Sequence, residues 1–252
     1  MADRLRVCAL YPELMSIYAD RGNLLLLERR CAWRGIAFEL TRAGHGDGLD
    51  PDAHDLFYMG GGQDRDQRLV AEDLVAHKRE ALHAAAARGA VILAVCGGFQ
   101  LLGDHYELGA ERIGGVGLVD AHTVRAAGGT QTRLVGNVAI EVALPGLDGP
   151  RVLAGFENHG GRTHLGPGAR PLGRVLSGHG NTGASGFEGV LAGTVVGTYL
   201  HGPLLPKNAW FADWLVQSAL SLDAPLAPLD DRLEDAAHAS ALRAAGIVDR
   251  TR

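Results

Sequence analysis

The sequence predicts an α/β protein with a mostly parallel sheet flanked by helices and extended by antiparallel strands. Two observations support this fold class. Strand and helix patterns alternate through the first half of the chain, which is typical of a parallel sheet covered by helices. Beyond Ile113 the pattern changes to short alternating segments separated by glycines, which is typical of antiparallel strands. We expect one domain over residues 1–223 and a helical or partly ordered tail over 224–252.

Each element of the first half has a local signal of its own. The apolar runs "LRVCAL" and "AVILAV" have the length and composition of buried strands. One helix is predicted between an Asn23 cap and Gly35, and a second has one apolar face that ends before Gly89. The expected strands cover residues 5–10, 36–41, 55–62 and 90–95, and the expected helices cover residues 23–35, 64–88 and the segment from Phe99 onwards.

The second half is predicted to hold antiparallel strands and a closing helix. The segments "GNVAIEVALPG" and "RVLAGFENHGG" alternate apolar and polar residues and contain turn glycines. A further strand is expected within "GTVVGTYLHG" (193–202). The segment "NAWFADWLVQSAL" (208–220) has the pattern of an amphipathic helix.

Composition excludes several classes of function. The chain has 252 residues, of which 46% are hydrophobic, and a formal net charge of -5 with no basic run. Nucleic acids and anionic membrane surfaces are therefore not expected partners. No apolar run reaches the length of about eighteen residues that a membrane span needs, and the start "MADRLRVCAL" lacks the apolar core of a signal peptide. We expect a cytoplasmic protein without direct membrane insertion.

One of the three cysteines has the surroundings of a nucleophile. Cys8, Cys31 and Cys96 form no C-x-x-C pair, so free thiols are expected. Cys96 follows the buried strand 90–95 and precedes two glycines and a helix, which is the strand–turn–helix pattern of a nucleophile elbow. A helix N-terminus favours the thiolate and lowers the thiol pKa from about 8.5. An isolated Cys-Gly-Gly fits a buried core cysteine equally well.

A cysteine nucleophile needs a base and donors for an oxyanion. Of the eleven histidines, His201 lies at the end of an apolar strand, where it reaches the thiol if the two strands are neighbours. The Gly97 amide is placed to donate into an oxyanion hole, and the glycine turn after strand 55–62 supplies a second donor. This glycine turn is not a phosphate loop, because neither Lys78 nor Lys207 follows a glycine.

Six segments of the chain resemble one family. "CGGFQLLG" has the C-x-G-x-Q pattern of class I glutamine amidotransferases, which have a flavodoxin-like α/β fold. The chain is more narrowly similar to the cobyric-acid-synthase-like branch, and in particular to glutaminase subunits that help amidate lipid II. The other five segments are "YADRGN" (18–23), "GGGQDRDQ" (60–67), "TRLVGN" (132–137), "GFENHGGRTH" (155–164) and "GTYLHGPLLPKN" (197–208).

The resemblance implies a role for each matching residue. Cys96 attacks the carboxamide of glutamine, which leaves a glutamyl thioester, and His201 protonates the leaving amine and then activates water. Gly97 forms the oxyanion hole together with Gly61 or Gly62. Substrate binding falls to Gln100 and to Arg133, whose planar guanidinium suits an α-carboxylate. His159 is expected to be a structural hydrogen-bonding residue, and no metal site is expected.

One departure from the wider superfamily bears on partners. Most class I members carry a glutamate two residues after the catalytic histidine, and here that position is Pro203. A remote acid of this chain or a partner protein supplies the third group, and the resemblance favours the partner. That partner is a Mur-ligase-like synthetase, forming a heterodimer with this chain. It would bind ATP and magnesium, hold lipid II and use the ammonia to amidate D-glutamate in peptidoglycan precursors, so this chain needs no cofactor.

Three other readings of the sequence stay open. The first is a glutaminase of the same branch that serves cobyrinate-type amidation, although the chain shows no fused ATP site. The second is a catalytically silent scaffold for the ligase. The third is a cysteine hydrolase of another α/β family, which explains the elbow but not "TRLVGN".

Overall fold

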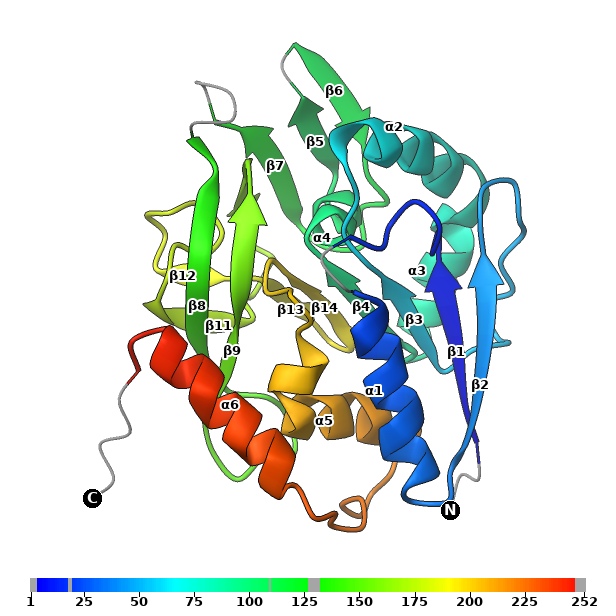
Figure 1. The fold of residues 1–252 in the computed structure, drawn as a ribbon. Coiled ribbons are helices and arrows are strands. Elements are labelled where there is room, and N and C mark those ends of the chain that lie inside the picture. The colour runs from blue at the N-terminus through cyan, green and yellow to red at the C-terminus, as the bar shows by residue number, and fades with distance from the viewer. Residues whose placement is uncertain (1–3, 18–19, 109, 127–131, 248–252) are drawn as a thin grey trace.

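The computed structural model describes residues 4–17, 20–108, 110–126 and 132–247. At its centre is a six-stranded sheet with the order β13-β14-β4-β3-β1-β2 (Figure 1). All neighbouring strands in this central sheet are parallel except β13 and β14. Its strands are β1 (Arg4–Leu10), β2 (Ala37–Ala43), β3 (Leu56–Met59), β4 (Val91–Val95), β13 (Val190–Ala192) and β14 (Val195–Thr198).

Two four-stranded sheets make up the rest of the strand structure in the part of the chain that the structure describes. The second sheet has the order β10-β7-β5-β6, and the third has the order β12-β11-β8-β9. The second sheet contains β5 (His105–Leu108), β6 (Glu111–Gly114), β7 (Ala121–Arg125) and β10 (Gly161–Leu165). The third contains β8 (Leu134–Val142), β9 (Arg151–His159), β11 (Gly173–Ser177) and β12 (Phe187–Glu188).

Helices cover both faces of the central sheet. The crossover from β1 to β2 and that from β3 to β4 run in opposite directions along the sheet, so right-handed connections put their helices on opposite faces (Figure 1). The helices are α1 (Arg21–Ala32), α2 (Asp64–Asp73), α3 (Arg79–Ala87), α4 (Gly97–Leu102), α5 (Ala209–Ala219) and α6 (Arg232–Ala244), with a π-helical turn η1 (Leu74–Lys78) and a 3₁₀ turn η3 (Leu205–Lys207).

The predicted fold class is confirmed, and two element boundaries are corrected. Helix α1 begins at Arg21, so Asn23 is not its cap. Asn23 is instead buried, donates to the Tyr58 hydroxyl and accepts the Leu205 N–H. The helix after the nucleophile begins at Gly97 rather than Phe99, because the turn is completed within a single residue.

The helix expected over residues 64–88 is interrupted by a π-helical turn. Lys78 is fully buried there, and its Nζ lies 2.5 Å from Asp73 Oδ2. The same carboxylate accepts the Tyr11 hydroxyl, and Lys78 lies over the Tyr11 ring. The extra residue of the π-helical turn brings the buried Lys78 ammonium to the Asp73 carboxylate. A pattern of apolar residues carries no signal for a contact between two polar side chains.

A buried arginine joins the C-terminal segment to the rest of the chain. Arg30 of α1 is 0% exposed and bonds both Asp213 of α5 and Asp231, the residue before α6. Arg34 binds the same Asp213 carboxylate. The tail expected over 224–252 therefore includes a docked helix, whereas the domain boundary at 223 stays a prediction.

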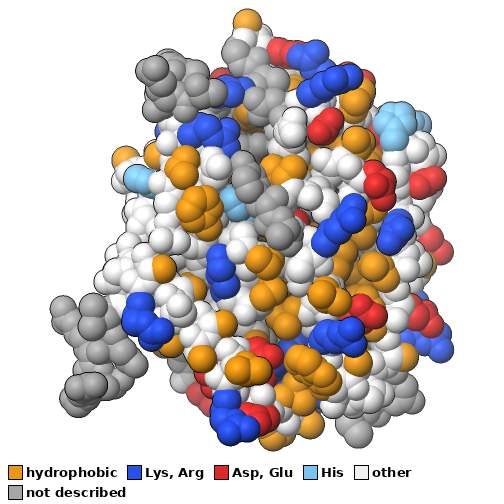
Figure 2. All heavy atoms as spheres, in the orientation of Figure 1, with side chains coloured by type: hydrophobic (Ala, Val, Ile, Leu, Met, Phe, Trp, Pro, Cys, Tyr) orange, Lys and Arg blue, Asp and Glu red, His pale blue; other side chains and the backbone are white. Residues whose placement is uncertain are grey.

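The surface has one feature that concerns partners. Hydrophobic side chains gather over α1 and the neighbouring edge strand β2 (Figure 2), and Leu25, Trp33 and Leu40 are 51%, 54% and 41% exposed. Among the described residues, no helix is both long and apolar enough to cross a bilayer.

We predict that Arg30→Ala lowers the free energy of unfolding by roughly 1–3 kcal/mol, because Asp231 loses its bonds to the guanidinium and Asp213 keeps only Arg34. Chemical denaturation measures the change. Arg232→Ala is the matched control, since Arg232 pairs with the adjacent Asp230 on the surface and its loss should be undetectable. Equal stability of the two variants would contradict the anchoring role of Arg30.

Candidate active site

Cys96 occupies a strained turn between β4 and α4. Its backbone has φ 53° and ψ -107°, a region that non-glycine residues rarely adopt. Two backbone bonds hold the turn: Cys96 N–H donates to Thr198 O at 2.8 Å, and Gly98 N–H donates to Gly60 O at 3.1 Å. A Cβ on Gly98 would lie 2.7 Å from Met59 O, so only glycine fits there. The turn has the geometry of a nucleophile elbow.

His201 lies at the end of the neighbouring strand. In the central sheet Thr198 pairs with Val95, so β14 and β4 end together, and His201 follows three residues later. An isolated bridge to Phe156 of β9 fixes its backbone through bonds of 3.1 and 3.0 Å. The strand adjacency required for a Cys–His pair is therefore present.

The surroundings of His201 keep its imidazole neutral. Burial lowers its pKa to about 4, with further lowering from the charges of His159, Lys207 and Arg133. The shift costs the imidazolium form roughly 3 kcal/mol relative to an ordinary histidine. The ring is thus available as a proton acceptor at neutral pH.

The two glycines predicted as alternative oxyanion donors in the glycine turn differ in their hydrogen bonds. The N–H of Gly61 donates to Asp20 Oδ2 at 2.7 Å, so it does not point toward a substrate. The amide nitrogen of Gly62 lies 3.0 Å from the position that a Cβ on Gly97 would take. Gly62 and Gly97 therefore stand next to each other, and the assignment of this pair to the oxyanion hole stays a prediction.

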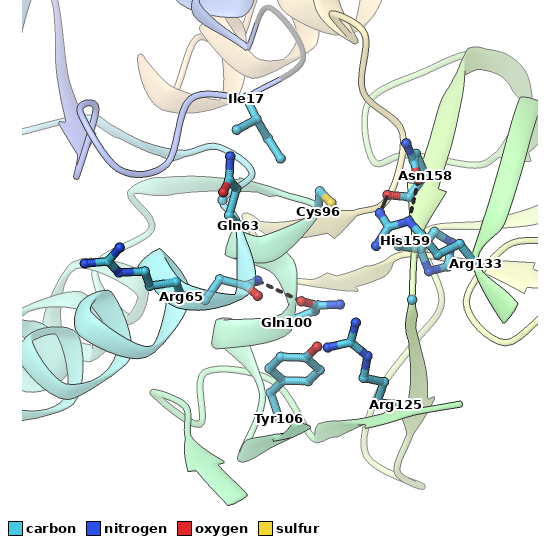
Figure 3. Close-up of a pocket in the computed structure, with 13 residues that line it drawn as sticks. Ile17, Gln63, Arg65, Cys96, Gln100, Tyr106, Arg125, Arg133, Asn158 and His159 are labelled. Carbon is cyan, nitrogen blue, oxygen red and sulfur yellow. Dashed lines mark hydrogen bonds between the residues drawn. The ribbon is translucent and has the colours of Figure 1, made fainter. Parts of the chain in front are cut away.

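The thiol opens into a cavity of about 380 Å³ (Figure 3). Among its described lining residues there are three arginines and no carboxylate, so the cavity suits an anionic ligand. It is lined by Ile17, Gly62, Gln63, Arg65, Gln67, Cys96, Gln100, Tyr106, Arg125, Arg133, Asn158, His159 and Gly160.

Arg133 is held in this cavity by its neighbour on β9. Its Nε donates to Asn158 Oδ1 at 2.7 Å and one terminal nitrogen donates to Asn158 O at 2.6 Å. The other terminal nitrogen lies 3.7 Å from the Cβ position of Gly160, a residue that lines the cavity. The guanidinium is thereby oriented before substrate arrives, as its predicted role in carboxylate binding requires.

Gln100 is fixed at both ends of its amide. Its Oε1 accepts from Gln67 Nε2 at 2.8 Å, and its Nε2 donates to the Tyr199 hydroxyl at 3.2 Å (Figure 3 shows the first bond). Both ends of the amide are thus bonded to protein groups, and the predicted role of Gln100 in holding substrate falls to the part of its side chain that lines the cavity. Gln67 and Tyr199 were not expected at the site, although both lie within the segments "GGGQDRDQ" and "GTYLHGPLLPKN".

His159 has the partners of a structural residue. Its Nδ1–H donates to Gly161 O at 2.9 Å, and its ring stacks on Tyr199 with centroids 3.6 Å apart. Its Nε2 lies 3.5 Å from a Glu157 oxygen. Both nitrogens thus face protein groups rather than the thiol, which agrees with the structural interpretation.

The remaining cysteines and histidines do not extend the site. Burial raises the pKa of Cys8 and of Cys31 to about 11, so neither thiol ionises readily. His164 stacks against His122 at 5.4 Å. Over the residues that the structure describes, no group of three or more His, Cys, Asp or Glu side chains is arranged to hold a metal ion.

The elbow, the glycine turn and the parallel sheet define the class I glutamine amidotransferase fold. PurLQS from Thermotoga maritima superposes with a TM-score of 0.61 at 20% identity, covering 86% of this chain and 98% of that one. A glutamine amidotransferase from the same organism superposes with a TM-score of 0.53 at 17% identity, covering 96% of this chain and 94% of that one. At these identities the likeness shows the fold alone.

The chain belongs to the CobB/CobQ-like glutamine amidotransferases, whose family model matches residues 6–209. Among curated proteins, it is 38% identical to the GatD subunit of the glutamine-hydrolyzing lipid II isoglutaminyl synthase of Streptococcus pneumoniae, over 86% of this chain and 81% of that protein. The corresponding Staphylococcus aureus subunit is 37% identical over 81% of this chain and 80% of that protein. The resemblance seen in the six sequence segments is confirmed.

We predict that Cys96→Ser abolishes ammonia release from glutamine while leaving the fold intact, because a serine hydroxyl is a far weaker nucleophile than a thiol at neutral pH. Ammonia and thermal unfolding are measured on the same preparation. The control is Cys8→Ala, a buried cysteine of β1 outside the cavity. Retained turnover in Cys96→Ser would remove Cys96 from the nucleophile position.

We predict that Arg133→Ala raises the KM for glutamine by about 10- to 100-fold, because the α-carboxylate loses a charge-assisted partner. Steady-state kinetics give KM and kcat separately. Arg174→Ala is a matched control, since this arginine pairs with Glu141 on the surface of the third sheet. A KM equal to that of the wild type would exclude Arg133 from substrate binding.

Proposed function

We propose that this chain is the glutaminase subunit of a two-protein amidotransferase. The observation that supports it best is the strained Cys96 turn, bonded to the strand that carries His201 and opening into a cavity with an oriented arginine. Membership of the glutamine amidotransferases makes L-glutamine the substrate that this cavity serves.

The proposed reaction has two halves. The Cys96 sulfur attacks the γ-carboxamide carbon, and the carbonyl oxygen takes up negative charge against the Gly97 and Gly62 amides. His201, having accepted the thiol proton, gives it to the departing nitrogen, so that ammonia leaves and a γ-glutamyl thioester remains. A water molecule then loses a proton to His201 and attacks the thioester, which releases glutamate and restores the thiol.

The ammonia is proposed to serve a Mur-ligase-like synthetase bound to this chain as a heterodimer. Both full-length relatives described above carry names that assign them to lipid II isoglutaminyl synthase as a subunit. By analogy, the synthetase would use ATP and magnesium to activate the α-carboxylate of D-glutamate in lipid II, in the cytoplasm. The exposed apolar side chains of α1 and β2 provide a surface of the kind that protein partners cover.

The electrostatics of His201 support a catalytic group supplied by the partner. The charges that act on this imidazole lower its pKa, and Pro203 takes the position where most class I enzymes have a glutamate. The buried Glu157 accepts the N–H groups of His179 and Gly180. A partner carboxylate against His201 would stabilise the imidazolium and complete the site.

The cobyrinate-type alternative has less support. A cobyric acid synthase from Pelotomaculum thermopropionicum is 37% identical, but over only 48% of this chain and 25% of that protein. The two lipid II relatives match this chain along most of their own length instead.

The experiment is glutamate production by the chain alone and after adding the Mur-ligase-like protein from the same genome. We expect a slow reaction alone and an increase of about 10-fold or more on mixing, because a carboxylate at His201 contributes on this scale. Cys96→Ser mixed with the same synthetase is the control. Fast turnover alone that mixing leaves unchanged would contradict the two-protein proposal.

The pH profile tests the electrostatic part of this proposal. His201 must be neutral to accept the thiol proton, so kcat/KM of the free chain should fall only as the pH drops toward about 4. A partner carboxylate raises the pKa of His201, so the acidic limb of the complex should move upward by at least about one pH unit. An unmoved limb would mean that no acid reaches the imidazole in the complex.

A further inference from the structure

The segment "YADRGN" is prominent in the sequence, yet the proposed function gives it no role. Its described part, residues 20–23, lies at the start of α1, next to the glycine turn. Asp20 is 0% exposed, and its Oδ2 accepts the Gly61 N–H at 2.7 Å. Its Oδ1 is also buried and has no hydrogen-bond partner among the residues that the structure describes. Burying a carboxylate costs free energy, and a single bond to a backbone amide offsets only part of that cost. The position of Asp20 therefore needs a structural or functional explanation.

The contacts of the glycine turn supply that reason. Gly60 O accepts from Gly98 N–H, and Gly61 N–H donates to Asp20, so both polar groups of the Gly60–Gly61 peptide are fixed. The carbonyl of Gly61 accepts the Ile17 N–H at 3.2 Å. In a trans peptide the N–H points opposite to the C=O, so the Gly62 N–H points away from Ile17. The Gly62 nitrogen lies beside Gly97, as described above.

Asp20 also stands close to the nucleophile itself. A Cβ placed on Gly61 would be 3.4 Å from Asp20 Oδ2 and 3.3 Å from Cys96 Cβ, so the carboxyl and the nucleophile flank the same glycine. A Cβ on Gly60 would be 2.9 Å from the same oxygen. The two glycines therefore let the acid approach the loop backbone closely.

We propose that Asp20 is a positioning residue, which orients the glycine turn so that the Gly62 and Gly97 amides face one oxyanion. The inference rests on the proposed glutaminase function. Asp20 does not touch substrate in this arrangement; it acts through the Gly61 amide. Burial raises the pKa of Asp20 to about 7, so its carboxyl is partly protonated at neutral pH, while either form keeps an oxygen that accepts from Gly61.

The test compares Asp20→Ala and Asp20→Asn in the glutaminase assay, with the synthetase present. Alanine removes the acceptor, and we expect kcat to fall by about 100-fold, the scale of one oxyanion donor, with KM within about threefold. Asparagine keeps a carbonyl oxygen for Gly61, and we expect it to restore most of the kcat lost in Asp20→Ala.

A second readout separates positioning from folding. Iodoacetamide alkylates a thiol by displacement of iodide, without forming an oxyanion, so the alkylation rate of Cys96 should stay within about threefold of wild type in Asp20→Ala. Asp120→Ala is the matched control, because Asp120 likewise accepts a glycine amide, from Gly168, but outside the cavity. Its kcat should match wild type.

Each outcome decides the inference. A kcat for Asp20→Ala within about threefold of wild type would overturn it, and so would a parallel loss of alkylation, kcat and thermal stability, which would assign Asp20 to folding. An Asp20→Asn variant as slow as Asp20→Ala would also overturn it. Absence of glutaminase activity in the wild-type complex is a different result, because it would remove the proposed function before any variant is compared.

Discussion

The backbone conformation of Cys96 is the constraint on which the rest of the site depends. A left-handed, strained residue persists only where its surroundings over-determine it. Here Thr198 of β14 accepts the Cys96 N–H, and Gly60 of the glycine turn accepts the Gly98 N–H. The parallel pairing of β3, β4 and β14 brings both partners to the same edge of the central sheet. The turn presents the thiol to the cavity because two segments distant in sequence, β14 and the glycine turn, hold its backbone.

The start of α1 connects the two halves of the site. Asp20 bonds the glycine turn, Asn23 bonds the Leu205 N–H, and the ring of Pro203 would lie 2.9 Å from a Cβ on Gly22. The start of α1 therefore contacts both the glycine turn and the loop that follows His201. Pro203 stands where most class I enzymes have a glutamate, and its ring packs against Gly22. A side chain larger than glycine at position 22 would collide with this ring.

Sequence patterns were sufficient for the parallel sheet and for the strand ends at which Cys96 and His201 lie, whereas the catalytic roles of these residues stay predictions. Both depend on buried strands and glycine turns, which leave a periodic signal. The same patterns could not separate Gly61 from Gly62, because the two differ through the bond of the Gly61 N–H to Asp20, a residue about forty positions earlier in the chain. They also missed the π-helical turn at Lys78 and the buried Arg30. Charged side chains are usually exposed, so a sequence pattern predicts neither of these two as buried. Gln67, Tyr199 and Asn158 escaped for a similar reason: each acts by holding another polar side chain rather than through a pattern of its own.

The Phe156–His201 bridge joins two sheets that otherwise carry separate parts of the chemistry. Cys96, the proposed nucleophile, follows β4 of the central sheet, whereas the backbone of His201, the proposed base, is bonded to β9 of the third sheet. Further bonds cross between the same two sheets, because Asn208 bonds both backbone groups of Ala154 on β9, and Glu188 of β12 accepts from Thr198 and Tyr199. The position of the His201 backbone relative to Cys96 therefore depends on how the third sheet packs against the central sheet. A substitution far from the cavity that shifts β9 would change the geometry of the proposed catalytic pair without touching either residue.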